Sequence, residues 1–188
     1  MSQTWPQYPL IVPQAGSFLF RGVKIGCLLV HGYTCSAEEM LPLGEFLAKK
    51  GYSIMEIRLA GHGTHPANLT GIRYKDWLNS IQNGYFLLKG LTNKVVLIGQ
   101  SLGAMLALIS TPSISPAATI AISTPYNKPA LVEKIINRFV STFFPLIPKW
   151  YLRKKKIMGK RREFNYPAYP IVATRSLIEL EKVQEKLG

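Results

Sequence analysis

The sequence contains very little aspartate, histidine or cysteine. Its 188 residues include one aspartate, Asp76, and three histidines, all at or before His65. The two cysteines, Cys27 and Cys35, are too few for a disulfide framework, and we interpret them as reduced thiols of a cytoplasmic protein. We therefore expect a domain that holds no metal ion, uses no cofactor and is not cross-linked by disulfides.

Two features of secreted and membrane proteins are also missing. The N-terminal segment, MSQTWPQYPLIVPQAG, has neither the basic start nor the apolar stretch of a signal peptide. The stretch from Val95 to Asn127 has no charged residue, but glycines and prolines divide it, and its β-branched ends flank an Ala/Leu-rich middle. This texture predicts a strand, a helix and a second strand buried in a sheet protein, not a membrane span.

The positive charge is concentrated in one segment. The chain has 23 Lys and Arg against 10 Asp and Glu, a formal net charge of +13. Many of these basic residues fall between Lys149 and Arg162, where there is no acid. No nucleic-acid-binding motif accompanies the run, so we expect no nucleic-acid partner. A solvated helix face is the simplest interpretation, and a weak contact with an anionic membrane surface is the alternative.

Short apolar runs alternate with helical patterns up to Pro125. The predicted strands are Lys24–Val30, Tyr52–Leu59, Val95–Ile98 and Ala118–Ile122. Helical patterns follow the first three strands, and the first helix starts with Ser36 and Glu39 at the spacing of a capping box. Crossovers of this length join parallel strands, so the predicted fold class is α/β, a mostly parallel sheet with helices on both faces.

The texture changes after Pro125. Residues 127–170 are rich in Phe, Pro, Lys and Arg and show no strand-like run, which predicts an inserted helical cap. We assign residues 1–126 to the core that precedes the cap and residues 171–188 to a return helix of the core. The apolar residues of the cap either line a pocket for an acyl chain or only dock the cap onto the core.

The sharpest motif is a GxSxG sequence, Gly99-Gln100-Ser101-Leu102-Gly103. It follows a predicted strand and opens a predicted helix, which is the context of a nucleophile on a tight turn. Such a turn strains the backbone of the serine and holds its Oγ above the sheet. The glycines are needed because strand and helix approach closely there, and the helix N-terminus adds N–H groups beside the reacting oxygen.

A second motif, His31-Gly32-Tyr33-Thr34, lies at the carboxyl end of the first predicted strand. Ligands of open parallel sheets gather at that edge. A loop there can aim the Tyr33 N–H at the same point as the Leu102 N–H. The pair would supply two donors to an oxyanion that develops on a substrate carbonyl.

The segments HGYT, RLAGHGTHPANL, YKDWLNS and GQSLGA, between about Phe18 and Pro125, together resemble the α/β-hydrolase superfamily and, within it, the bacterial carboxylesterase and monoacylglycerol lipase group. The resemblance implies hydrolysis of a small-molecule ester, with a short to medium acyl chain or a monoacylglycerol, through an acyl-serine intermediate. It implies Ser101 as nucleophile and Tyr33 and Leu102 as oxyanion-hole residues. The residues expected to shape these loops are His31, Gly32, Gly99 and Gly103.

The sequence departs from the family pattern after Ser101. The triad of the family follows the order Ser, acid, His, whereas this chain has no histidine and no aspartate beyond that serine. We therefore expect a truncated, C-terminally incomplete core with impaired activity. His62 is the best internal substitute for the base, although ordering its own loop is the expected role. The alternative function is a non-catalytic module that binds lipid or an anionic membrane surface through its apolar, basic cap.

Overall fold

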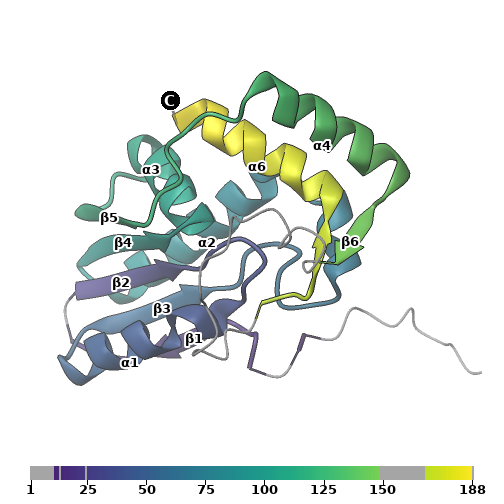
Figure 1. Ribbon diagram of the computed structural model, residues 1–188. Helices are drawn as coiled ribbons and strands as arrows, with labels where there is room; N and C mark the ends of the chain where they lie inside the picture. Colours follow the sequence, from purple (N-terminus) through teal and green to yellow (C-terminus); the bar gives the residue numbers. More distant parts are fainter. Residues whose placement is uncertain (1–10, 13, 24, 149–167, 188) are drawn as a thin grey trace, which may run out of the picture.

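The computed structural model describes residues 11–12, 14–23, 25–148 and 168–187 (Figure 1). Its main sheet has five strands in the order β1-β3-β2-β4-β5. These strands are β1 (Phe18–Phe20), β2 (Ile25–Val30), β3 (Ser53–Ile57), β4 (Lys94–Gln100) and β5 (Ala118–Ile122). All neighbouring strands pair in parallel except β1, which runs antiparallel to β3. The predicted α/β class is confirmed, and the four predicted strands are present with slightly different ends.

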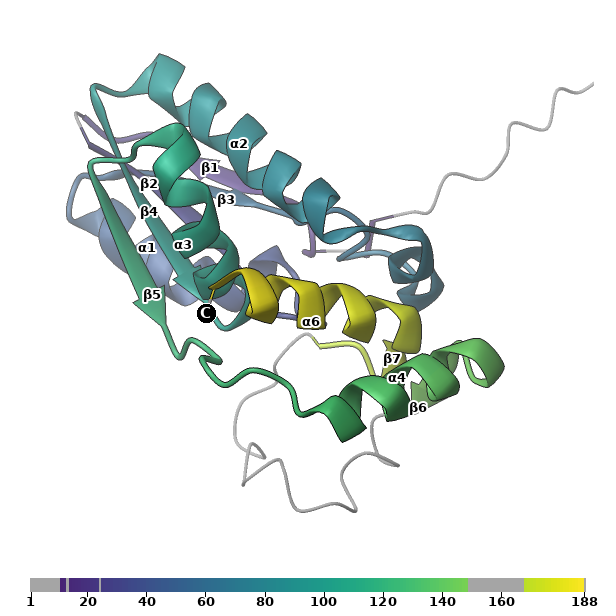
Figure 2. The same cartoon turned by 90° about the horizontal axis from the view of Figure 1, so that it is seen from above.

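Helices cover both faces of this sheet. Helix α1 (Leu41–Lys49) lies on one face, and α2 (Tyr74–Leu91) and α3 (Leu102–Ile114) lie on the other (Figure 2). Alternate residues of β2 pack into apolar clusters on the two faces of the sheet. Leu28 and Val30 belong to the larger cluster, which includes residues of α2 and α3, and Cys27 and Leu29 belong to the smaller one. This period of two is why a central strand with helices on both sides is apolar along its whole length.

The region after β5 contains more than helix. It holds α4 (Leu131–Phe143), β6 (Leu146–Pro148), β7 (Ile171–Ala173) and α6 (Thr174–Leu187). Strands β6 and β7 form an antiparallel pair. The expectation of no strand in residues 127–170 is wrong because β6 lies there, and β7 occupies the first three of the residues assigned to the return helix. The pair is only three residues long on each side, too short for the alternation by which strands are recognised in a sequence.

Helices α4 and α6 lie side by side beyond the carboxyl ends of the parallel strands (Figures 1 and 2). The Nζ atom of Lys134 contacts a carboxylate oxygen of Glu185 at 2.5 Å, and the Asn137 amide donates to Glu181 at 2.6 Å. The basic run between Lys149 and Arg162 lies outside the described residues. The division into core and cap at residues 126 and 170 stays a prediction.

Candidate active site

Ser101 lies between the end of β4 and the start of α3, in a backbone conformation that L residues rarely adopt. Its φ is +54° and its ψ is −112°. The turn is fixed from both sides, because the Ser101 N–H donates to the Ile122 carbonyl at 2.9 Å and its own carbonyl accepts from Ala104 at 3.1 Å. Strain held in this way is typical of functional turns, and it agrees with the conformation predicted for the GxSxG motif.

Three glycines bring β2, β4 and α3 into close contact around this turn. A Cβ atom on Gly99 would lie 2.1 Å from the Gly103 carbonyl oxygen, and one on Gly103 would lie 2.2 Å from the Val30 carbonyl oxygen. A Cβ atom on Gly32 would lie 3.4 Å from the Cβ of Ser101. The loop after β2 therefore lies close beside the serine.

The backbone amides of Tyr33 and Leu102 flank this contact. Leu102 is the first residue of α3, and Tyr33 follows Gly32 in the loop after β2. Within the part of the chain that the structure describes, neither N–H donates a hydrogen bond to a protein acceptor. Two unpaired donors beside a serine are what stabilisation of an oxyanion requires.

Glu39 connects the loop after β2 to the end of β4. One carboxylate oxygen accepts the Gly32 N–H at 2.7 Å, and the other accepts the Gln100 side-chain amide at 3.2 Å. The predicted capping box of Ser36 and Glu39 is wrong, because the Ser36 side chain makes no capping bond in the 3-10 helix η1 (Ala37–Met40). The spacing of a capping box concealed the actual role of Glu39, and no other signal in the sequence pointed to it.

His31 is fully buried beneath the loop after β2. Its Nδ1 donates to the Gly32 carbonyl at 2.9 Å, and its Nε2 accepts the Leu59 N–H at 3.1 Å. Burial lowers the pKa of His31 to about 4, and the charge of Arg58 adds to this effect. A neutral imidazole with both nitrogens engaged is suited to shape the loop and unsuited to take a proton from Ser101.

His62 is also buried, with its ring 4.9 Å from the His31 ring and 5.9 Å from the Trp77 ring. Its Nδ1 donates to the Ala60 carbonyl at 3.2 Å, and burial keeps its pKa well below the usual range. Its Nε2 has no hydrogen-bond partner among the described residues. These contacts support the expected ordering of its own loop, and none of them involves Ser101.

The remaining histidine and the single aspartate have local roles. His65 precedes the 3-10 helix η2 (Pro66–Gly71), where its Nδ1 accepts the Ala67 N–H at 3.3 Å. Asp76 accepts the Arg73 N–H at 2.8 Å in the first turn of α2. Neither contact brings His65 or Asp76 to Ser101 as a base or as the acid that orients a base.

Tyr169 and Ser176 hold the loops after β2 and β3, and the sequence alone did not predict these contacts. The Tyr169 N–H donates to the Thr34 carbonyl at 2.9 Å, and the Tyr169 hydroxyl accepts the Thr64 N–H at 2.9 Å. The Tyr33 hydroxyl lies 2.6 Å from the Ser176 hydroxyl, and burial raises the pKa of Tyr33 to about 12. Partners so distant along the chain leave no local pattern in a single sequence.

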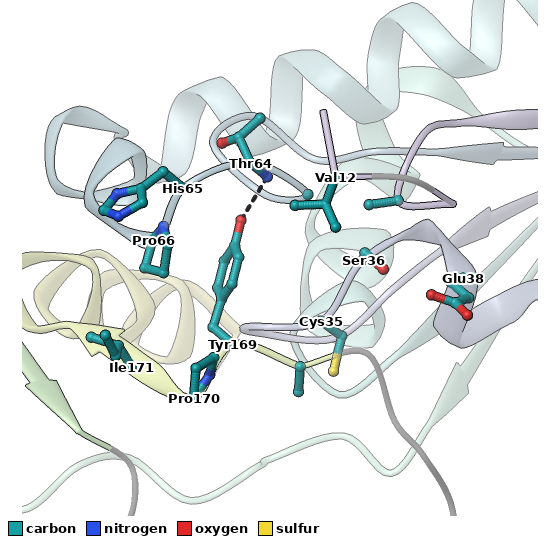
Figure 3. A pocket seen from close by; sticks show the side chains of 13 residues that line it. Val12, Cys35, Ser36, Glu38, Thr64, His65, Pro66, Tyr169, Pro170 and Ile171 are labelled. Carbon is teal, nitrogen blue, oxygen red and sulfur yellow. Dashed lines mark hydrogen bonds between the residues drawn. The ribbon is translucent and has the colours of Figure 1, made fainter. Parts of the chain in front are cut away.

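A cavity of about 610 Å³ adjoins the loop after β2 (Figure 3). Tyr169 stands in its wall, hydrogen-bonded to Thr64, with Cys35 and Ser36 at the side of the loop. Ser101 does not line this cavity, so the geometry of the GxSxG turn and not the cavity defines the candidate site.

Among the described residues, no three His, Cys, Asp or Glu side chains cluster in a way that could hold a metal ion. No helix among these residues is long and apolar enough to cross a membrane.

Comparison with curated proteins gives relatives that act on esters. The chain is 38% identical over 102 residues to a thermostable monoacylglycerol lipase of Bacillus sp. (strain H-257), which is 54% of this chain and 40% of the relative. It is 32% identical over 92 residues to a carboxylesterase of Bacillus subtilis (strain 168), covering 48% and 37% of the two chains. The matches therefore span about two fifths of each relative's length.

Solved structures give the same fold. A structure described under LipS and LipT, two metagenome-derived lipolytic enzymes, has a TM-score of 0.82 at 23% identity and covers 95% of this chain and 71% of its own. The monoacylglycerol lipase of Paleococcus ferrophilus has a TM-score of 0.66 at 15% identity, with 91% and 70% covered. The model of the alpha/beta hydrolase family matches residues 27–181. The chain therefore belongs to the alpha/beta hydrolase family.

Proposed function

We propose that the protein is a serine carboxylesterase that acts on short to medium acyl esters or monoacylglycerols. The observation that carries this proposal is the strained Ser101, packed against the Gly32 loop between two amides that have no acceptor among the described residues. The names of the two Bacillus relatives support the class of substrate.

In the proposed reaction the Ser101 Oγ attacks the ester carbonyl carbon. The carbonyl oxygen becomes an oxyanion that accepts hydrogen bonds from the Tyr33 and Leu102 amides. Collapse of this intermediate breaks the bond to the alkoxy oxygen, which takes up the proton lost by the Ser101 hydroxyl, so that the alcohol leaves and an acyl-serine remains. Water then attacks the acyl carbon, which frees the carboxylic acid and restores the serine hydroxyl.

The chain offers no suitable base for this reaction among its described residues. A serine hydroxyl is a poor nucleophile until a neighbouring base takes its proton. Both nitrogens of His31 are occupied, and His62 is buried with a pKa far below the usual range. No histidine or aspartate follows Ser101 in the sequence. We therefore propose that this chain, on its own, turns over esters with impaired efficiency.

A fluorophosphonate probe tests the role of Ser101. We expect slow covalent labelling of the folded chain, complete loss of labelling in Ser101→Ala, and unchanged labelling in Ser113→Ala, an exposed serine on the same helix α3. Intact-protein mass spectrometry measures the adduct, and circular dichroism verifies folding. A folded chain that is not labelled, or labelling that survives in Ser101→Ala, contradicts the proposed esterase.

A second candidate function is contact with a lipid surface through α4. At about 100° per residue, Lys134, Asn137 and Ser141 share the face that packs on α6. The opposite face is apolar and exposed, consisting of Leu131, Val132, Ile135, Ile136, Phe139 and Phe143. An amphipathic helix whose apolar face is exposed to solvent is the kind of helix that lies in a membrane interface. Exposed Arg138 beside it and the net charge of +13 favour anionic lipid as the surface bound.

Vesicle sedimentation tests this second function. We expect the chain to bind phosphatidylglycerol-containing vesicles, and the double variant I135Q/F139Q to bind at least ten-fold more weakly because two apolar side chains no longer enter the interface. The control is Phe86→Gln on α2, since Phe86 is 57% exposed and close to the 63% of Phe139. Equal binding by both variants, or self-association in light scattering that the double variant abolishes, rules out the lipid surface.

A further inference from the structure

A second cavity, of about 390 Å³, lies between α4, α6 and the end of η2. The described residues of its wall include four cationic side chains, Arg73, Arg138, Arg175 and Lys182, and one acid, Glu179. It is separate from the 610 Å³ cavity, with which it shares no lining residue, and Ser101 lines neither of them. The mechanism proposed above uses none of its residues.

Glu179 is the internal counter-charge of this cavity. It is 3% exposed and accepts hydrogen bonds from Lys182 Nζ at 2.7 Å, from the Tyr74 N–H at 3.0 Å and from Arg73 Nη1 at 3.4 Å. Burial alone would raise the pKa of Glu179, but these bonds and the charge of Lys182 lower it below the usual range. Glu179 is therefore an anion that orients two of the four cations.

Arg138 and Arg175 have no such partner. Neither makes an ion pair with any described residue, and the nearby carboxylate of Glu185 is bound by Lys134. Arg138 belongs to α4 and Arg175 to the first turn of α6, so the two arginines line the cavity from different helices. Thr70 and Thr142 line the same cavity.

We propose that this cavity binds a phosphate group. Guanidinium groups hold phosphate oxygens through paired hydrogen bonds, and arginines without a carboxylate partner have their donors available for this purpose. Four cations against one acid leave an excess that suits a dianion better than a singly charged carboxylate. The phosphate belongs either to a soluble phosphate ester or to a lipid headgroup. This site does not depend on the proposed esterase, because the proposed reaction uses none of its residues.

Inorganic phosphate is the probe for the site itself. Isothermal titration at fixed ionic strength should show phosphate binding more tightly than acetate. We expect Arg138→Gln and Arg175→Gln each to weaken phosphate binding about ten-fold or more, because each removes charge-assisted hydrogen bonds. The matched control is Lys94→Gln, which removes an exposed positive charge at the start of β4, outside the cavity.

The proposed phosphate site is wrong if phosphate binds no more tightly than acetate, or if Lys94→Gln weakens phosphate binding as much as the two arginine variants do.

Two further experiments identify the source of the phosphate. Vesicles with phosphatidic acid that bind the parent chain but not Arg138→Gln or Arg175→Gln indicate a lipid headgroup. Competition by glycerol phosphate with unchanged vesicle binding in these variants indicates a soluble ester. Labelling of Ser101 is measured separately, so loss of the esterase proposal leaves this result intact.

Discussion

Glu56 is a carboxyl group in an apolar layer of the sheet. It lies in β3 on the same face as Ile54, and it is fully buried with neither carboxyl oxygen hydrogen-bonded to any described residue. Burial raises the pKa of Glu56 well above the usual range, and the nearby charge of Glu39 raises it further. A group of this kind lowers the stability of the fold whenever it is ionised.

We expect Glu56→Leu to stabilise the protein by about 1–3 kcal/mol at pH 8, the usual cost of an unsatisfied buried polar group. The sign follows from linkage. Below the pKa of the unfolded state Glu56 is protonated in both states, and as the pH rises only the unfolded state ionises easily. The stability gained by the variant should therefore grow from pH 4 to pH 8. Urea unfolding at both values measures it.

Glu45→Leu is the control for this effect. Glu45 is an exposed glutamate on α1, so its replacement should change the free energy of unfolding little and by a similar amount at both pH values. If Glu56→Leu gains the same stability at pH 4 as at pH 8, the carboxyl is not responsible and only the packing of leucine is.

Single residues were predictable where their chemistry sits in a local pattern. The strained serine and the crowded glycines follow from the GxSxG context, and the structure shows both. Glu39 was misjudged because its spacing from Ser36 also fits a helix cap. Glu56 carries no signal at all, since a glutamate in a strand is as compatible with a solvent-facing position.

Among the elements, the apolar strands with long crossovers were the most predictable. Strands β2 to β5 appear where the sequence places them because a buried parallel strand is apolar throughout. Strands β1, β6 and β7 have only three residues each. A strand this short shows no alternation of apolar and polar residues, so it is recognised only from the strand with which it pairs.

Helix α3 continues past Pro112 to Ile114 and ends at Ser115, which has a left-handed backbone conformation. A proline so close to a helix end removes one hydrogen bond without breaking the helix.

At the scale of the whole molecule, one segment connects the two loops near Ser101. The backbone of Tyr169 is bonded to Thr34, and its hydroxyl accepts the Thr64 N–H and donates to the Gly61 carbonyl at 3.3 Å. Thr64 lies in the loop after β3 and Thr34 in the loop after β2. No sequence pattern predicts this connection, because it joins positions more than a hundred residues apart.

We expect Tyr169→Phe to reduce the free energy of unfolding by about 1–3 kcal/mol, because the ring stays in place while the buried Thr64 N–H loses its acceptor. Faster amide hydrogen exchange should appear in the loop around Thr64 and extend to the loop around Tyr33, which the same residue holds through Thr34. The matched control is Tyr126→Phe, because Tyr126 is 73% exposed. If exchange increases only around Thr64, the two loops open independently and Tyr169 does not couple them. If it increases around both, the segment that carries Tyr169 sets the position of the proposed oxyanion donor, and a change in that segment reaches Ser101 without touching it.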